Sequence, residues 1–312
     1  MALPEFTHIH CSSRYDRTAA SLEKAVDGWR EQSSIITLTE VSRDPRGATL
    51  REAGWGYARA SKDYGRDECA VCYRKDTWAL SWQGYKKLNT RGRVFAGPVC
   101  SCDALLKHKT SGHKLLLTVT HMPSGVEGGG GRWNTHKSYW QARRQAYLSS
   151  LETWSTHIKQ LKRSKKPDAV MIIADWNFNL KRNWSRDLLK DHFGSGYKHA
   201  WVRFPTSGGS LHGGPVVPLA APGKGNMDRI IDGTLYQGLN VDQAPNLMAT
   251  TASSDHRPYK ERFAFASKAG SPGATDDDDT ASGDTKPGDE WWGFGDYIDD
   301  EIYAMDFAEE GS

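Results

Sequence analysis

The sequence predicts an α/β fold in which packed, mainly antiparallel β-sheets are flanked by helices. Roughly ten short strand-like segments alternate with only two stretches that repeat apolar residues at helical spacing. The run 169–174 is uninterruptedly apolar, which is typical of a strand that is buried on both faces. With 312 residues, 38% of them hydrophobic and 25% charged, the chain can bury a sizeable core.

The first half of the chain alternates strands with one helix. A helix beginning near Thr18 places Leu22, Ala25, Val26 and Trp29 on one face. The segment 115–119 is a buried strand that leads to His121, and the preceding strands suggest an antiparallel run. The expected strands are 5–10, 34–39 (ending at Glu40), 69–73, 77–82, 99–106 and 115–119.

The second half begins with a glycine-rich loop at 128–131, which leads into a long helix. The apolar stripe of that helix is formed by Tyr147, Leu151, Trp154, Ile158 and Leu161. The apolar strand 169–174 then ends at Asp175, a loop-rich stretch spans 206–225, and a strand follows Asp228. The segment 260–266 closes a domain that we place at residues 1–266.

Residues 267–312 form an acidic tail of different composition. Its first part, 267–287, is rich in Gly, Ser, Thr, Pro and Asp and is expected to be disordered. Farther on, within 291–307, aromatic and aliphatic residues recur at helical spacing among acidic ones. This segment could dock on a protein partner or compete for a basic groove of its own domain, and a solubilising appendage is the alternative.

The modest net charge of +3 conceals a division of charge. The tail carries 14 acidic and 2 basic residues, so residues 1–266 hold 39 basic against 24 acidic ones. A basic body favours a polyanionic partner, although excess Lys and Arg also serve solubility. The five cysteines suggest buried thiols in a reducing, cytoplasmic setting, and we expect neither a signal peptide nor membrane insertion.

Acidic and amide side chains follow several of the predicted strands. Glu40 and Asp255 could hold Mg²⁺ or Mn²⁺ through a few oxygen ligands, with waters completing the shell. Asp175 and Asn177 lie two residues apart, so in extended geometry one could orient a water while the other contacts a phosphate. An Asx-turn that closes the strand is the alternative reading of this pair, and Glu40 alone would be a solvated residue.

Two histidines complete the expected site. His121 and His256 could each donate a hydrogen bond to a phosphate oxygen, provided that a carboxylate fixes the tautomer. Glu68 and Asp228 are the natural carboxylate partners. A lone histidine is usually structural, but two histidines with matched acids favour a catalytic site.

The order of these motifs resembles the endonuclease/exonuclease/phosphatase superfamily over about residues 5–266. Asp175-Trp176-Asn177-Phe178-Asn179 is similar to the family's Gly-Asp-Phe-Asn motif, with Ala174 in the glycine position. Ser254-Asp255-His256 matches the closing Ser-Asp-His motif. Thr39-Glu40-Val41 resembles the Gln-Glu metal motif, and Met227-Asp228-Arg229-Ile230 resembles the Asp-Arg-Ile strand.

This resemblance implies a four-layer sandwich of two sheets with helices outside, and it assigns a role to each residue. By this resemblance, Glu40 would bind the metal, with Asp255 nearby. Asp175 would activate the water and Asn177 would contact the phosphate. His121 would pair with Glu68, and His256 with Asp228. The family also has an asparagine at the end of the first strand. In this register we expect His8 beside the metal, with His10 as the alternative on the same face.

The implied activity is divalent-metal-dependent phosphodiester hydrolysis, and we expect a nuclease of low sequence specificity that prefers DNA to RNA. After the glycine-rich loop, the chain carries groups suited to a phosphate backbone and to base stacking: Arg132, Trp133, His136 and Lys137. One alternative is a phosphatase of the same fold acting on a phosphoinositide, a sphingolipid or a nucleotide. The other is a nucleic-acid-binding protein with weak catalysis.

Overall fold

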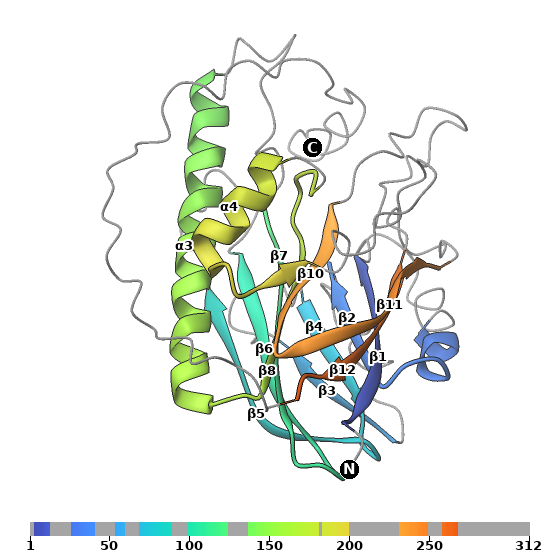
Figure 1. The fold of residues 1–312 in the computed structure, drawn as a ribbon. Coiled ribbons are helices and arrows are strands. Elements are labelled where there is room, and N and C mark those ends of the chain that lie inside the picture. Colours follow the sequence, from blue (N-terminus) through green and yellow to red (C-terminus); the bar gives the residue numbers. More distant parts are fainter. Residues whose placement is uncertain are drawn as a thin grey trace, which may run out of the picture.

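The computed structural model describes residues 3–12, 26–40, 54–59, 69–88, 99–123, 137–180, 183–199, 231–248 and 258–267. Within these ranges, the strands form two six-stranded β-sheets that lie face to face (Figure 1). Each sheet is antiparallel except for one parallel pair near its middle. The predicted fold class, two mainly antiparallel sheets with helices outside, is confirmed.

The first sheet has the strand order β11-β12-β1-β2-β4-β3. Its parallel pair is β1–β2, in which Ser12 lies opposite Thr39 at the carboxyl ends. The strands are β1 (Glu5–Ser12), β2 (Ile35–Thr39), β3 (Trp55–Arg59), β4 (Cys69–Arg74), β11 (Leu239–Leu247) and β12 (Tyr259–Phe265).

The second sheet has the order β5-β6-β7-β8-β10-β9. Its parallel pair is β7–β8, in which His121 lies opposite Asp175, again at the carboxyl ends. The strands are β5 (Trp78–Lys87), β6 (Cys100–His108), β7 (Lys114–His121), β8 (Ala169–Asp175), β9 (Lys198–His199) and β10 (Asp232–Gln237).

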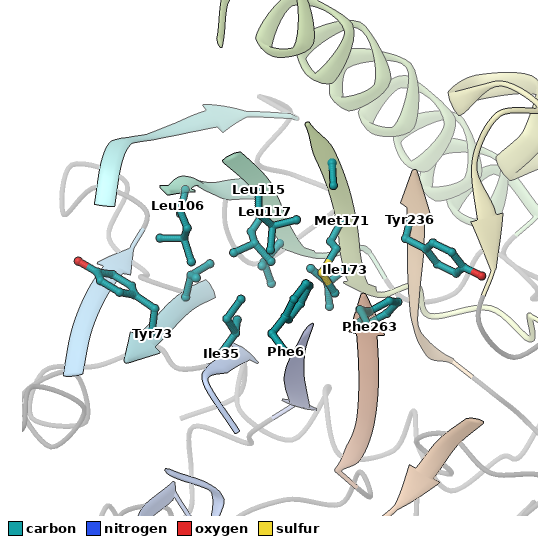
Figure 2. Close-up of a cluster of buried hydrophobic side chains, with 14 of the residues drawn as sticks. Phe6, Ile35, Tyr73, Leu106, Leu115, Leu117, Met171, Ile173, Tyr236 and Phe263 are labelled. Atoms are coloured by element: carbon teal, nitrogen blue, oxygen red, sulfur yellow. The ribbon is translucent and has the colours of Figure 1, made fainter. Parts of the chain in front are cut away.

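The apolar core lies between the two sheets. Figure 2 shows Phe6, Ile35 and Phe263 of the first sheet facing Leu117 and Met171 of the second. Because alternate residues of a strand point to opposite faces, every second residue of these strands enters this layer. The alternate residues face outward, where the helices cover them.

Helices form the two outer layers. The long helix α3 (Lys137–Lys165) and the shorter α4 (Asn183–Phe193) pack on the outer face of the second sheet (Figure 1). All five apolar residues of the predicted stripe of α3 are buried. On the opposite side of the molecule, Val26 and Trp29 of the helical segment 26–30 pack on the outer face of the first sheet. The order helix, sheet, sheet, helix is the predicted four-layer sandwich.

A buried carboxylate also joins α3 to the second sheet. Asp103 on β6 accepts hydrogen bonds from Thr118 Oγ1 at 2.6 Å and from Ser101 Oγ at 3.1 Å. His157 Nε2 on α3 lies 2.8 Å from the same carboxylate, and Trp154 Nε1 donates to Thr118 Oγ1 at 2.8 Å. Ser101 and His157 thus both contact the Asp103 carboxylate, and the His157 contact anchors α3 to the sheet.

Most sequence-based boundaries agree with the structure, and four elements were not anticipated: β3, β9, β11 and α4. All five cysteines are buried thiols, as expected. Among the described helices, none is long and apolar enough to cross a membrane. The helix start at Thr18, the loop 206–225 and the tail from residue 268 lie outside the described residues.

Candidate active site

The carboxyl ends of the two parallel pairs carry the polar residues of the candidate site. Ser12 ends β1, Glu40 follows the last residue of β2, and His121 and Asp175 end β7 and β8. The sheets contact each other through β2 and both β7 and β8, which brings these ends together. His121 Nε2 lies 3.7 Å from Glu40 Oε1 and 3.7 Å from Asp175 Oδ2.

Asp175 is held in place at the base of this group. Its side chain is 2% exposed. The Asn177 backbone N–H donates to its Oδ1 at 3.0 Å, and the Ser12 hydroxyl approaches its Oδ2 at 3.4 Å. Asn177 is fixed in turn, because its side-chain amide donates to the Met122 carbonyl oxygen at 2.7 Å. The Asx-turn and the functional reading of Asp175 and Asn177 are therefore compatible.

Two residues of the site have a left-handed backbone that is uncommon outside glycine. The φ angle is 57° at Glu40 and 53° at Asn177. Such residues cluster at active sites, where the surrounding structure maintains a conformation that costs of order 1–3 kcal/mol. At Glu40 the turn follows directly after β2, and its side chain, 20% exposed, lies beside His121.

The predicted metal ligand His8 lies in the interior of the molecule and not at the end of β1. His8 is fully buried, its Nδ1 lies 3.2 Å from Glu261 Oε2, and its Nε2 lies 2.8 Å from Thr37 Oγ1. Both ring nitrogens are therefore engaged in the interior. His10 is buried as well, with Nδ1 2.9 Å from the same Thr37 hydroxyl. β1 continues past both histidines, so Ser12 is the residue at the strand end beside Asp175.

The two histidines belong to a buried polar network beneath the site. Thr234 Oγ1 donates to Glu261 Oε2 at 2.8 Å and lies 2.9 Å from the Tyr259 hydroxyl. Desolvation by burial lowers the pKa of His8 to about 3, and burial likewise raises the pKa of Glu261 to about 8. Near neutral pH the two groups therefore meet as neutral partners and not as an ion pair.

Asp232 is a site residue that the sequence reading missed. It begins β10, lies opposite Asp175 in the antiparallel β8–β10 register, and is 1% exposed. Its Oδ1 lies 3.7 Å from His10 Nε2, so it connects the candidate site with the buried network. The available signal was its position at the start of a strand, four residues after the predicted Asp228.

The remaining predicted residues lie outside the described part of the chain. The structure describes His121 but not Glu68, its expected partner. Lys137 begins α3, but its side chain is not described. The predictions that stay untested for this reason concern Glu68, Asp228, Asp255, His256, Arg132, Trp133 and His136.

The described side chains fit a hard divalent cation through their chemistry. No three His, Cys, Asp or Glu side chains of the described ranges are arranged to hold a metal ion by themselves. Glu40 and Asp175 nevertheless present carboxylate oxygens around one imidazole, and the buried Thr39 hydroxyl next to Glu40 has no hydrogen-bond partner among the residues that the structure describes. Mg²⁺ commonly uses one or two carboxylates, while waters and substrate phosphates complete its shell.

The chain shares its fold with solved endonuclease/exonuclease/phosphatase proteins. It matches no protein-family model and no curated protein. A solved endonuclease/exonuclease/phosphatase protein from Bacteroides vulgatus is similar, with a TM-score of 0.63 and 14% identity over 84% of this chain and 100% of that one.

Two further solved structures carry more specific names. The mannosyl-6-phosphatase Bt3783 of Bacteroides thetaiotaomicron has a TM-score of 0.57 and 16% identity over 83% of this chain and 99% of its own. D. rerio TDP2 complexed with a single-strand DNA product has a TM-score of 0.57 and 12% identity, over 83% and 98%. At these identities the likeness establishes the fold.

Proposed function

We propose that this protein is a metal-dependent phosphoesterase that cleaves phosphodiester bonds of nucleic acid, with DNA preferred to RNA. The observation that carries the proposal is the position of His121 Nε2, 3.7 Å from carboxylate oxygens of both Glu40 and Asp175. Phosphodiester hydrolysis needs an activated water and neutralisation of charge on the phosphoryl oxygens. This group of side chains has the chemistry to supply both.

Each side chain has a role that follows from its surroundings. Asp175 is buried and held by Asn177 and Ser12, so it can orient a water and accept its proton. His121, with 23% of its side chain exposed, can donate to a phosphate oxygen. The Asn177 amide has a second hydrogen for the same purpose. Glu40, with the undescribed Asp255, would hold Mg²⁺ or Mn²⁺, which supplies a Lewis acid for the phosphoryl group.

Two observations support nucleic acid as the substrate. Residues 1–266 carry a large excess of basic residues, which suits a partner with a phosphate backbone. The similar TDP2 structure contains a single-strand DNA product. Phosphomonoester hydrolysis is the second candidate, because the mannosyl-6-phosphatase has the same fold.

The test compares cleavage of plasmid, single-stranded DNA and RNA, and phosphate release from inositol phosphates, with Mg²⁺, Mn²⁺ or EDTA. Asp175→Asn removes the base but keeps the shape, and we expect a loss of about 10²- to 10⁴-fold in rate. Asp191→Asn, on the exposed surface of α4, is the matched control and should retain parental activity. Equal cleavage by Asp175→Asn and the parent would refute the role of Asp175. Phosphate release without strand cleavage would establish the second candidate.

A further inference from the structure

Four lysines gather where α3 ends against the second sheet. Lys107 on β6 and Lys114 on β7 lie directly opposite each other in the antiparallel register. Each is two residues from a leucine that packs beneath α3, so both belong to the outer face that this helix covers (Figure 1). Lys165 ends α3 and Lys166 follows it, and the Lys165 ammonium lies 4.4 Å from the ring centroid of Trp82 on β5. We call these four lysines the basic end surface.

Backbone contacts hold the end of α3 beside β7. The Lys114 N–H donates to Asp168 Oδ2 at 2.8 Å, and the Asp168 N–H donates to the Lys114 carbonyl oxygen at 2.9 Å. Asp168 is only two residues after Lys166, so the lysines of the helix lie next to those of the strands. Lys107 and Lys166 are exposed, and Lys114 and Lys165 are partly exposed. Within the described ranges, none of the four forms an ion pair.

This concentration of positive charge is unfavourable unless an anion is bound. Like charges that lie directly opposite each other on adjacent strands destabilise a sheet. Cations at the carboxyl end of a helix are favourable, so α3 itself accounts for Lys165 and Lys166. The helix does not account for the facing pair Lys107 and Lys114. A bound polyanion would remove the repulsion within that pair.

The acidic tail begins beside the basic end surface. Ser267 is the last described residue, and the N–H of Ala266 donates to the Gly238 carbonyl oxygen at 3.0 Å. Gly238 in turn packs on the chain between α3 and β8, since a Cβ atom there would overlap the Asp168 carbonyl oxygen. Strands β10, β8, β7 and β6 are successive neighbours in the sheet. Lys107 therefore lies three strand spacings, or about 15 Å, from the strand that meets the start of the tail.

Four consecutive aspartates occur in the tail at a matching distance. They occupy positions 276–279, and the residues 268–275 before them are mostly Gly, Ser, Ala, Pro and Thr. A Gly/Ser-rich stretch of about nine residues has an average end-to-end distance of about 15–18 Å. The effective concentration of a tethered group is highest when this distance matches the span to its binding site. The aspartate run therefore has both the charge and the reach to bind the four lysines.

We propose that the aspartate run 276–279 binds the basic end surface of its own chain through ion pairs with the four lysines. His121, at the other end of β7, lies seven residues beyond Lys114, or about 23 Å along the strand. The run is thus held at the opposite end of the sheet from the candidate active site, where it does not compete with the substrate. This contact does not depend on the proposed hydrolysis.

Zero-length cross-linking of the full chain tests the contact directly. A carbodiimide joins a carboxylate to a lysine amine, and mass spectrometry of the digest identifies each linked pair. We expect the run to be linked to the basic end surface at about 0.01 M salt, where the Debye length is about 30 Å. At about 1 M salt, where this length is about 3 Å, the yield should fall at least about fivefold. Lys86, exposed at the other end of β5, is the internal control and should stay unlinked.

An equal mixture of isotope-labelled and unlabelled protein shows whether a link joins one chain or two. Because we assign the run to the surface of its own chain, the linked peptides should carry the same isotope.

Acetylation of the lysine amines tests whether the run covers the surface. In the neutralised variant, the four lysines should react about threefold faster than in the parent, because the tethered anion is lost. This variant combines Asp276→Asn, Asp277→Asn, Asp278→Asn and Asp279→Asn. The matched control removes the same charge farther along the tail and should react as the parent does. It combines Asp296→Asn, Asp299→Asn, Asp300→Asn and Glu301→Gln.

Four results would overturn the proposal. Three of them are links from the run to Lys86 as often as to the basic end surface, links between two different chains, and parental acetylation rates in the neutralised variant. The fourth is protection of the four lysines by a short DNA duplex to the same degree in the parent and in the neutralised variant, which would assign the surface to nucleic acid. Asp175→Asn should show the parental links and rates, so failure at this surface is distinguishable from failure of the proposed hydrolysis.

Discussion

Replacing Glu261 with glutamine tests the protonation of the buried network beneath the candidate site. A glutamine amide has nearly the shape of a protonated carboxyl group. With its amide oxygen at the Oε2 position, it can accept hydrogen bonds from the Thr234 hydroxyl and from a protonated His8 Nδ1, but it cannot ionise. The variant therefore keeps the contacts of the network. It removes the ionisable carboxyl group of residue 261 from both the folded and the unfolded chain.

The expected pH dependence follows from the number of protons bound. The folded His8–Glu261 pair keeps one proton from about pH 3 to about pH 8. With the usual pKa values of 6.5 and 4.5, the unfolded pair binds two protons below pH 4.5, one up to pH 6.5 and none above. The free energy of unfolding is thus level between pH 4.5 and 6.5 and falls on both sides, since folding excludes a proton from His8 in acid and retains one on Glu261 in alkali.

The glutamine variant loses only the contribution of Glu261. Between pH 5 and pH 8 the folded parent holds the Glu261 proton that its unfolded chain has released, which destabilises the parent by about 1.4 kcal/mol per pH unit. Across these three units, the free energy of unfolding of Glu261→Gln should therefore rise by about 4 kcal/mol relative to the parent.

Urea unfolding followed by tryptophan fluorescence at pH 5, 6, 7 and 8 measures this difference. Glu31→Gln, at an exposed carboxylate after the helical segment 26–30, is the control and should give a profile parallel to that of the parent. Parallel profiles for Glu261→Gln and the parent would show that Glu261 is ionised in the folded protein, which contradicts the neutral network.

Two further substitutions test the geometry. Gly238→Ala should destabilise the protein by at least about 2 kcal/mol, because φ is 73° and a Cβ would overlap the Asp168 carbonyl oxygen. Gly194→Ala, where φ is 92° but nothing lies within 4 Å, isolates the strain, and equal losses in urea unfolding would rule out the overlap. Ser12→Ala should lower the hydrolysis rate about fivefold at unchanged KM and Tm, since it removes one hydrogen bond to Asp175. An unchanged rate would exclude a positioning role for Ser12.

The meeting of Glu40, His121 and Asp175 could be predicted because each residue ends or follows an apolar strand. Two of these strands, β7 and β8, are a parallel pair, so their carboxyl ends share an edge. Strand β2 brings Glu40 to the same edge through the contact between the sheets. The uninterrupted apolar run 169–174 is typical of a strand buried on both faces, and the polar Asp175 after it marks the end of this strand.

The first strand shows where this reasoning fails. His8, His10 and Ser12 lie on one face of β1, but the sequence-based prediction ended this strand at His10. Pairing of β1 with β2 as far as Thr39 extends the strand to Ser12. A strand end that is set by a distant partner cannot be deduced from local composition.

The same limit explains Asp232 and α4. The register of β10 against β8 places Asp232 opposite Asp175. Helix α4 has one tryptophan and two leucines among charged residues, and Phe193 at its end packs on Trp154 of α3, with ring centroids 5.7 Å apart. Both features depend on contacts between segments far apart in the sequence.

Along β1, the interior between the two sheets changes from apolar to polar toward the candidate active site. Phe6 belongs to the apolar core, whereas His8 and His10 on the same face enter the polar network. Within the described part of the chain, His10 Nε2 and Glu261 Oε1 are buried without a hydrogen-bond partner, which costs about 1–3 kcal/mol for each group. An apolar continuation of the core would avoid that cost. The polar network instead extends from Glu261 through His10 to Asp232, which lies opposite Asp175 in the sheet. It thereby provides the fixed polar environment that a catalytic carboxylate requires.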